Sequence, residues 1–328
     1  MSRVVVVTGA SAGVGRAAAK AFGARGDRVA LLARSERGLA GAQEEVESAG
    51  GRALAIPTDV ADAEQVEAAA ERAERELGPI DVWVNDAMAT IFAPVAEVSA
   101  PDYRRATEVT YLGTVWGTMA ALRRMAPRDR GVIVQVGSAL SYRAIPLQAA
   151  YCGAKFAIRG FTDALRTELL HDRSGVHVTM VQLPAVNTPQ FNWCKTKLSR
   201  HPQPVPPIFQ PEVPAEAIVW AADHPRRELW VARSALKAIL AAKLAPSIAD
   251  RYLARTGYDA QQTDEPVSAD RPSNLYEPVD GLHATHGSFD ARATASSPEL
   301  WLTEHRGSLA GAGAAVAAGA AALALLRR

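Results

Sequence analysis

The sequence predicts an α/β fold, in which a doubly wound parallel sheet carries helices on both faces. Short apolar runs alternate with helix-forming stretches through the first two hundred residues of the 328-residue chain. Alternation of this kind predicts parallel strands joined by crossover helices. The first apolar run, Val4–Val7, leads through a glycine-rich turn directly into the helix-forming stretch Arg16–Phe22. Together these observations predict one sheet built from repeated strand–helix units.

The strands are predicted from runs rich in Val, Ile, Leu and Ala that are bounded by turn residues. In chain order they are Arg3–Val7, Arg28–Ala33, Arg52–Pro57, Val82–Asn85, Val132–Val136, His177–Gln182 and a last one near Glu228–Ala232. The longer helices between them are Asp62–Leu77, with Asp62 as a suitable N-cap, a segment from about Pro101 to Met125, and Tyr151–Leu170. Such folds bind ligands at the carboxyl ends of the strands. The residues at these ends are Gly9, Asp59, Asn85, Ser138 and Pro184.

The turn after the first strand has glycines at positions 9, 13 and 15. Glycines let a backbone turn tightly and approach a pyrophosphate, and the helix that follows offers unpaired N–H groups to the anion. The spacing is G-x-x-x-G-x-G and not the commoner G-x-G-x-x-G. A tight turn that binds nothing is the alternative for this segment taken alone.

Tyr151 and Lys155 are four residues apart, which places them on one face of the predicted helix. A free phenol titrates near ~10, and a neighbouring ammonium makes its anion less costly. Ser138 lies thirteen positions before Tyr151, just after a predicted strand. Any amphipathic helix can produce Tyr-x-x-x-Lys by chance. Its combination with the glycine turn and Ser138 is what indicates a catalytic role for these residues.

These motifs together resemble the short-chain dehydrogenase/reductase family. The resemblance rests on Thr8–Gly15, Asn85–Ala87, Ser138 and Tyr151–Lys155, covers roughly residues 1–235, and matches the compact single-domain branch. It implies a Rossmann-type fold and hydride transfer between a nicotinamide cofactor and a ketone, aldehyde or secondary alcohol. It also implies that Tyr151 exchanges a proton with the substrate oxygen and that Ser138 holds that oxygen. Lys155 would lower the pKa of the tyrosine and bind the nicotinamide ribose.

Cofactor choice is predicted from the end of the second strand, where Ala33 is followed by Arg34. NAD-preferring relatives place an acidic residue there. Its absence removes repulsion toward a 2′-phosphate, which a guanidinium can bind, so NADP(H) is expected in preference to NAD(H). A solvated arginine is the alternative. The resemblance assigns cofactor binding to Gly9, Ser11, Ala12, Gly13, Val14, Gly15, Arg34, Asp59, Val60, Asn85, Ala87, Tyr151, Lys155, Pro184 and Thr188.

Two positions depart from the family pattern. Thr110 stands where the family usually has an asparagine that holds a water of a proton relay, so Thr110 is a further candidate catalytic residue. Met88 replaces the usual glycine after Asn85-Asp86-Ala87 and adds bulk near the cofactor. These changes keep an alternative open, namely a catalytically impaired NADP(H)-binding sensor or scaffold protein of the same fold.

Charge and cysteine content restrict the partners. Lys and Arg total 36 against 35 acidic residues, so nothing favours nucleic acid. Two cysteines cannot form a disulfide framework, which favours a reducing, cytoplasmic location. His283, His286 and His305 match no metal-ligand spacing, so no metal site is expected. The expected partners are a small carbonyl or alcohol substrate and, as is common in the family, further copies of the chain in a homodimer or homotetramer.

Three segments follow the predicted strand that ends at Gln182. Eight prolines between positions 184 and 214 predict a long loop, and residues 185–211 are interpreted as a lid over the substrate. The apolar lid residues Phe191, Trp193, Ile208 and Phe209 favour a lipophilic substrate. Residues 246–306 are an irregular extension, either partly disordered or packed on the core. The predicted catalytic domain is therefore 1–245.

The last segment, 307–328, is an apolar tail. No charged side chain occurs from Gly307 to Leu326, and about twenty apolar residues suffice for a bilayer-spanning helix. The tail is rich in Ala and Gly, so a helix docked on the protein or on a partner subunit is the competing interpretation. Membrane association through residues 307–326 is the hypothesis that its length supports.

Overall fold

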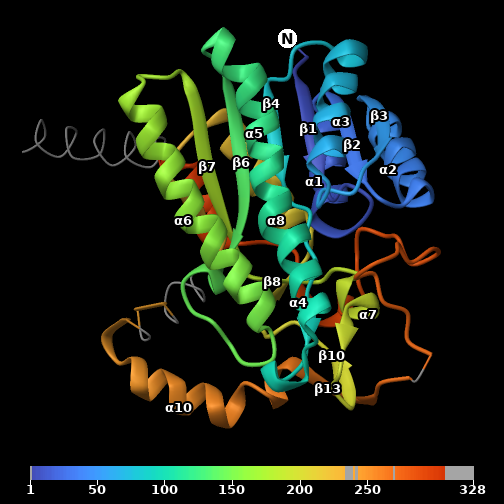
Figure 1. Cartoon of the computed structure of the whole chain (residues 1–328), viewed down its shortest axis with the longest axis vertical. Helices are drawn as coiled ribbons and strands as arrows, with labels where there is room; N and C mark the ends of the chain where they lie inside the picture. Colours follow the sequence, from blue (N-terminus) through green and yellow to red (C-terminus); the bar gives the residue numbers. More distant parts are fainter. Residues whose placement is uncertain (1, 233–238, 241–242, 269, 307–328) are drawn as a thin grey trace, which may run out of the picture.

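The structure is a computed structural model that describes residues 2–232, 239–240, 243–268 and 270–306. Seven strands form one parallel sheet with helices on both faces, which confirms the predicted fold class (Figure 1). The strand order is β3-β2-β1-β4-β6-β7-β12. Because the order reverses beside β1, the carboxyl ends of β1 and β4 flank the crevice in which such sheets bind ligands.

The sheet strands agree with the sequence prediction to within a few residues at either end. They are β1 (Val4–Thr8), β2 (Arg28–Ala33), β3 (Arg52–Pro57), β4 (Val82–Asn85), β6 (Gly131–Ser138), β7 (Val176–Leu183) and β12 (Glu228–Trp230). The central strands are buried on both faces, which explains why their sequences are continuous apolar runs without alternation.

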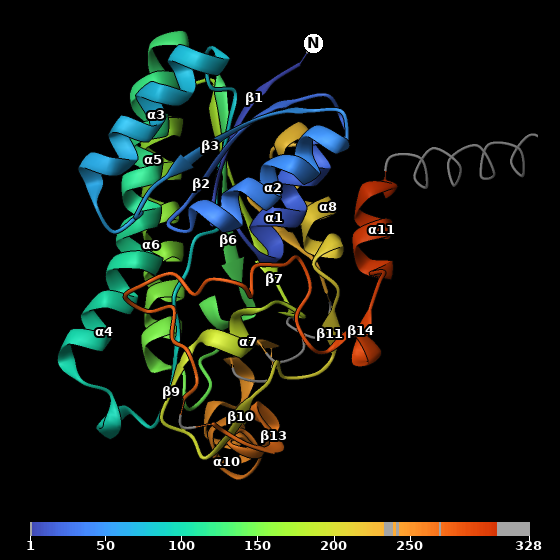
Figure 2. The same ribbon diagram turned by 90° about the vertical axis from the view of Figure 1, so that its right-hand side faces the viewer.

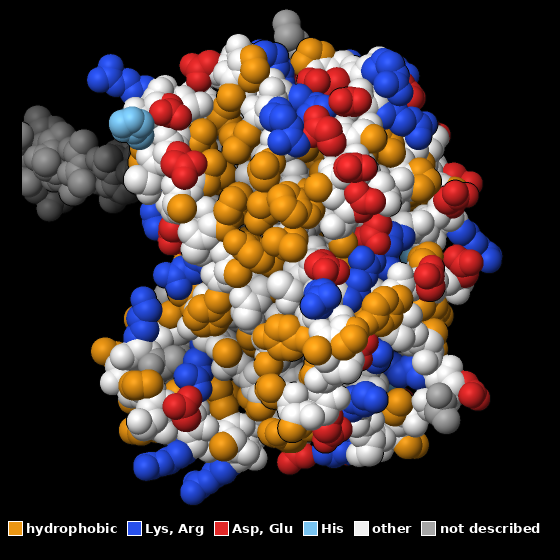
Figure 3. Space-filling model, in the orientation of Figure 1, with side chains coloured by type: hydrophobic (Ala, Val, Ile, Leu, Met, Phe, Trp, Pro, Cys, Tyr) orange, Lys and Arg blue, Asp and Glu red, His pale blue; other side chains and the backbone are white. Residues whose placement is uncertain are grey.

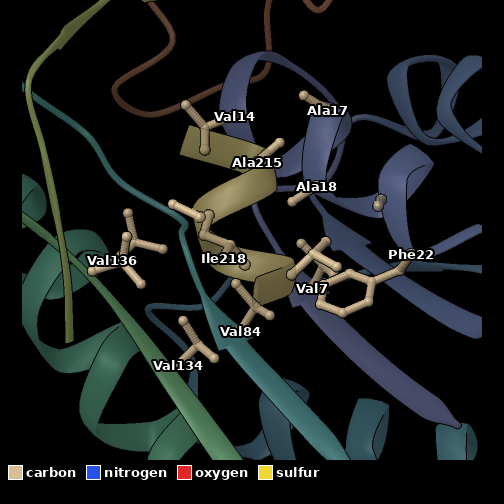
Figure 4. Packing of buried hydrophobic residues seen from close by; sticks show 14 of the residues in the cluster. Val7, Val14, Ala17, Ala18, Phe22, Val84, Val134, Val136, Ala215 and Ile218 are labelled. Atoms are coloured by element: carbon tan, nitrogen blue, oxygen red, sulfur yellow. The ribbon is translucent and has the colours of Figure 1, made fainter. Parts of the chain in front are cut away.

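Helices cover the two faces as two layers (Figure 2). One layer consists of α1 (Gly13–Gly23), α2 (Glu36–Ser48) and α8 (Glu212–Asp223). The other consists of α3 (Ala63–Leu77), α4 (Ala100–Thr107), α5 (Gly113–Met125) and α6 (Ala149–His171). Ile218 of α8 packs among strand residues such as Val84 and Val134 in the first layer's core (Figure 4). Asp62 caps α3 by accepting hydrogen bonds from two backbone N–H groups, as expected.

The helix predicted from about Pro101 to Met125 is not continuous. A π-helical turn, η2 (Glu108–Leu112), separates α4 from α5. Within it the Thr110 hydroxyl donates to the Ala89 carbonyl and accepts from the Ala89 N–H, both at 2.9 Å. Insertions of this kind are frequent at functional sites, and here the turn lies beside β4.

The predicted lid contains short elements and pairs with the C-terminal extension. The lid elements are β8 (Ala185–Val186), α7 (Gln190–Trp193), β9 (Lys195–Thr196), β10 (Arg200–Pro202) and β11 (Ile208–Phe209). The extension contains α10 (Pro246–Thr256), η5 (Asp259–Gln261), β13 (Gln262–Pro266), η6 (Asp290–Arg292), β14 (Ala293–Thr294) and α11 (Pro298–Glu304). β10 pairs with β13, and β11 pairs with both β8 and β14.

Of the two alternatives for residues 246–306, the structure shows packing on the core for the part from Leu275 to Leu300, whereas α10 has no buried residue. Leu275, Phe289 and Leu300 of the extension are buried in the hydrophobic clusters. The remaining short elements are β5 (Ile91–Phe92), which pairs with β9, and the 3-10 turns η1 (Val95–Glu97), η3 (Ala126–Arg128) and η4 (Ala139–Ser141).

The apolar tail, 307–328, lies outside the described residues, so the membrane hypothesis made for it is not addressed by the structure. Within the part of the chain that is described, no helix combines the length and the apolar character needed to cross a bilayer.

Candidate active site

A cavity of about 430 Å³ lies at the carboxyl ends of β1, β4 and β6. It extends from Arg34 and Ser35, at the end of β2, to Tyr151 and Lys155 on α6. The predicted site residues that line it are Gly9, Ser11, Ala12, Gly13, Val14, Arg34, Asp59, Val60, Ala87, Ser138, Tyr151, Lys155, Pro184 and Thr188. Gly15, Asn85 and Thr110 do not line it.

The glycine turn has the shape that a phosphate cradle requires. Gly9 and Gly13 have φ angles of 75° and 57°, a region that favours glycine. A Cβ atom at Gly15 would lie only 2.6 Å from the carbonyl oxygen of Gly9, so no larger residue fits without movement. The helix α1 begins at Gly13, and its N-cap residue, Ala12, makes no side-chain capping bond. Its first N–H groups lie at the cavity wall, where Gly13 N donates to the carbonyl oxygen of Ala284.

Ser138, Tyr151 and Lys155 converge at the other end of the cavity. Ser138 is the last residue of β6, and its hydroxyl accepts a hydrogen bond from Leu140 N at 3.1 Å. The Lys155 ammonium lies 5.5 Å from the centroid of the Tyr151 ring and donates to Val136 O at 2.6 Å. The nearby Ser138 hydroxyl favours the anion of Tyr151. The serine is thus placed where it can share a substrate oxygen with the phenol.

The electrostatics of this end differ from the sequence expectation. Burial raises the pKa of Tyr151 above its ordinary value, and the contact with Ser138 only partly offsets this. Burial also lowers the pKa of Lys155 to about 8, although the nearby carboxylate of Asp86 favours the ammonium. The net result for the phenol is a raised pKa, because desolvation disfavours its anion more than the contact with Ser138 favours it.

Asp86 is a site residue that the sequence reasoning missed. It lines the cavity, and burial raises its pKa to about 7, while Lys155 and the Gly15 N–H lower it. In the sequence Asp86 is only the middle residue of the Asn85–Ala87 motif. The sequence does not indicate that its carboxylate lies beside Lys155. A buried acid and a buried amine with displaced pKa values are typical of functional sites.

Two predicted residues are engaged elsewhere. The Asn85 side chain accepts from Trp83 Nε1 at 2.8 Å and donates to Thr118 and Gln135, so it belongs to a buried polar network behind the sheet edge. Thr110 is fully buried, and its hydroxyl is occupied by both backbone groups of Ala89. Both residues therefore support the cavity from behind and do not reach into it.

At the opposite end of the cavity, Arg34 and Asp59 have protein partners. The Arg34 guanidinium donates to the backbone carbonyl groups of Asn274, Leu275 and Tyr276. Burial lowers the pKa of Arg34 below its ordinary value. Asp59 forms an ion pair with Arg105 of α4. The Arg34 side chain is thus held at the cavity wall and does not extend freely into solvent.

The lid supplies only part of the wall expected from it. Phe191 and Trp193 line the cavity together with Leu140, Ile145, Gln148 and residues 203–207. Ile208 and Phe209 do not line it, because β11 directs them into hydrophobic clusters. This end of the cavity is therefore mainly apolar, with Ser138, Tyr151, Gln148 and Gln203 among its polar groups.

Residues of the C-terminal extension also line the cavity, and no sequence signal pointed to them. They are Asn274, Pro278, Val279 and His283. His286, which the sequence grouped with His283, instead contacts Glu212 and Asp290 at the surface. The described residues contain no group of three or more His, Cys, Asp or Glu side chains arranged to hold a metal ion.

Comparison with known proteins decides the family. The short chain dehydrogenase family model matches residues 3–197. The chain belongs to the short-chain dehydrogenase family. It is 32% identical to the uncharacterized oxidoreductase YxnA of Bacillus subtilis, over 86% of this chain and 80% of that protein. It is 34% identical to 3-dehydrosphinganine reductase of Danio rerio, over 66% of this chain and 67% of that protein.

A solved structure is also similar to this short-chain dehydrogenase. It is an alcohol dehydrogenase from the archaeon Thermococcus sibiricus, complexed with 5-hydroxy-NADP, with a TM-score of 0.61 and 28% sequence identity. The match covers 70% of this chain and 96% of that one. The family resemblance drawn from the motifs is confirmed, and the chain is an oxidoreductase of that family.

Proposed function

We propose that this protein is an NADP(H)-dependent oxidoreductase that interconverts a lipophilic ketone or aldehyde and the corresponding alcohol. The observation that carries the proposal is the convergence of Ser138, Tyr151 and Lys155 on the same cavity as the glycine turn. The cavity reaches from the glycine turn to the Tyr151 phenol and the Ser138 hydroxyl, which fits an extended dinucleotide and a small reacting group. A bound nicotinamide supplies the hydride chemistry.

The chain's own residues position the substrate and move its proton. Tyr151 gives a proton to the carbonyl oxygen in reduction and removes it from the alcohol in oxidation. Ser138 orients that oxygen by a hydrogen bond. Lys155, fixed to Val136, places a positive charge 5.5 Å from the Tyr151 ring centroid, so that proton loss from the phenol is less costly.

The preference for NADP(H) is supported by three observations. Arg34 lies at the cavity end formed by β2 and Ser35, and Ala33 leaves that strand end without a carboxylate. A guanidinium can bind a 2′-phosphate through two N–H groups. The similar alcohol dehydrogenase was solved with an NADP derivative.

A lipophilic substrate and the reducing direction are supported by the wall and by a relative. Phe191, Trp193 and Ile145 make the substrate end apolar. One relative is named for the reduction of 3-dehydrosphinganine. The alternative of a non-catalytic sensor or scaffold is not favoured, because all three reacting side chains face the cavity and the relatives are named as oxidoreductases and reductases.

Assembly and location also remain proposals. Hydrophobic side chains gather on the face formed by α5 and α6 (Figure 3), where Met119 and Phe156 are exposed. We propose that this face joins copies of the chain into a homodimer or homotetramer, and that the enzyme works in the cytoplasm as its cysteine content predicts.

The decisive experiment follows nicotinamide absorbance with NADPH and a panel of apolar and polar carbonyl compounds. Turnover is expected with apolar ketones or aldehydes, and Tyr151→Phe should reduce it by about 10²–10⁴-fold. Tyr258→Phe, a change at an exposed tyrosine, is the matched control and should leave turnover unaltered. NADPH binding without turnover of any carbonyl would overturn the proposal in favour of a sensor.

A further inference from the structure

Residues 271–290, which we term the strap, cross the nucleotide end of the cavity. The strap follows β13 in the chain and precedes β14, and in Figure 1 it is the orange-to-red segment that runs past α7. It is anchored at one end by Leu275, whose side chain is 0% exposed, and by Tyr276, whose hydroxyl donates to Asp102 Oδ1 at 3.0 Å. At the other end Phe289 N donates to Asn187 Oδ1 at 3.0 Å. The strap is therefore a fixed part of the cavity wall in this structure.

The strap is also bound to the lid. Asn274 N donates to Trp193 O at 2.9 Å, and the His283 ring lies 5.0 Å from the Trp193 ring, centroid to centroid. Arg271 donates to the carbonyl oxygen of Phe191. Phe191 and Trp193 line the substrate end, so the strap connects the nucleotide end of the cavity to the substrate end.

Backbone carbonyl oxygens of the strap occupy donors that are suited to phosphate. Ala284 O accepts from Gly13 N at 2.9 Å, at the start of α1. Tyr276 O accepts from Arg34 Nη1 at 2.6 Å, and Asn274 O accepts from Nη2 of the same guanidinium. Three of the five guanidinium N–H groups of Arg34 thus already donate to strap carbonyls, which leaves fewer donors for the bidentate binding of a phosphate.

The competition at Arg34 concerns only one of the two nicotinamide cofactors. The ribose 2′-phosphate of NADP(H) competes with the strap carbonyls for guanidinium N–H groups. The ribose 2′-hydroxyl of NAD(H) has no charge to neutralise and makes no such demand. The contact between the strap carbonyls and Arg34 therefore costs binding free energy for NADP(H) and little for NAD(H), whereas the bond from Gly13 N to Ala284 O affects both cofactors alike.

We propose that the strap is a determinant of cofactor specificity, in which the carbonyl groups of Asn274–Tyr276 compete with the 2′-phosphate for Arg34. This proposal rests on the nucleotide-binding function proposed above. It assigns to the C-terminal extension a role in the cofactor site that the family match, which ends at residue 197, does not include.

The test is a fluorescence titration of the purified full-length protein with NADPH and with NADH. Leu275→Ala removes the buried anchor and lets the strap lift from Arg34. The ratio Kd(NADH)/Kd(NADPH) is expected to rise at least fivefold, mainly through tighter NADPH binding. Leu282→Ala is the matched control, because Leu282 belongs to the same strap but is 40% exposed, and it should leave the ratio unchanged.

A second variant keeps the test decisive if Leu275→Ala does not fold. Tyr276→Phe removes only the hydroxyl that bonds Asp102, and it should raise the ratio at least twofold. Equal changes in both dissociation constants, or an unchanged ratio in every folded strap variant, would overturn the specificity role while leaving the proposed function intact. If the wild-type protein binds neither nucleotide, the proposed function fails and this proposal fails with it.

Discussion

Lys155 donates a hydrogen bond of 2.6 Å from Nζ to the carbonyl oxygen of Val136, which fixes the amine of α6 to strand β6. The same strand ends two residues later at Ser138. The serine and the amine are thus held by one strand, and Tyr151 lies one helical turn before the lysine. The mutual positions of the three groups therefore depend on the packing of α6 against β6.

Replacement of the lysine tests this arrangement. Lys155→Met is expected to reduce carbonyl turnover about 100-fold or more, because the positive charge beside the phenol is lost. Lys20→Met, at an exposed position of α1, is the control and should retain wild-type turnover. The measurement is kcat/KM for the best carbonyl of the panel. Full activity of Lys155→Met would contradict the role given to the amine.

Arg34→Ala is expected to weaken NADPH binding selectively. A charge-assisted hydrogen bond contributes about 1.5–3 kcal/mol, so the Kd for NADPH should rise by about tenfold or more, while the Kd for NADH changes little. Arg37→Ala, at an exposed position three residues on, serves as the control. Isothermal titration with both nucleotides gives the four constants. Equal weakening of both would remove the reason for assigning the 2′-phosphate to Arg34.

The carboxyl group of Asp86 is expected to make the free energy of unfolding depend on pH. Burial raises its folded-state pKa from the ordinary 3.8 to about 7, so its stabilising contribution is present below the unfolded pKa and is lost as the pH rises through the folded pKa. Asp86→Asn abolishes this titration. The variant should therefore gain stability relative to wild type as the pH rises from about 4 to about 7, by about 1–3 kcal/mol.

Urea unfolding across this pH range measures the effect. Asp172→Asn, an exposed change after α6, provides the control and should follow the wild-type curve. Parallel curves for Asp86→Asn and wild type would show that the carboxyl group does not titrate in this range in the folded protein.

Removal of the Thr110 hydroxyl is expected to lower the free energy of unfolding. Its hydroxyl satisfies both backbone groups of Ala89, so Thr110→Val leaves a buried donor and a buried acceptor unpaired. Each such loss costs about 1–3 kcal/mol. Thr107→Val removes a hydroxyl that bonds Tyr103 O near the surface and should cost far less. Denaturant midpoints compare the two, and an unchanged midpoint for Thr110→Val would show that the bonds to Ala89 contribute nothing to stability.

Loss of the Trp193 side chain is expected to weaken substrate binding. This side chain is 6% exposed and lines the substrate end of the cavity. Trp193→Ala should raise KM for an apolar carbonyl about tenfold or more, because the apolar area buried against the indole is lost. Trp301→Ala, where the indole is 51% exposed on α11, should have no such effect. A loss in kcat at constant KM would assign Trp193 another role.

The sequence by itself determined the sheet, the glycine turn and the spacing of the candidate site residues Tyr151 and Lys155. Continuous apolar runs are typical of strands that are buried on both faces, and this local signal located the central strands of the sheet. Glycines at 9 and 13 are required by the backbone angles of a tight turn, and Tyr151 and Lys155 share a helical face by spacing alone. These features depend on residues that are close together in the chain, so the amino-acid sequence is enough to predict them.

Only the tertiary structure decided what depends on partners distant in sequence. The raised pKa of Asp86 arises from burial beside Lys155, 69 residues away by their numbers in the sequence. The side chains of Thr110 and Asn85 hydrogen-bond buried groups behind the cavity. The Arg34 guanidinium donates to carbonyl groups that are 240–242 residues away in the sequence. Burial and pairing of this kind are properties of the folded arrangement, because desolvation depends on every segment that covers a group and not on its neighbours in the chain.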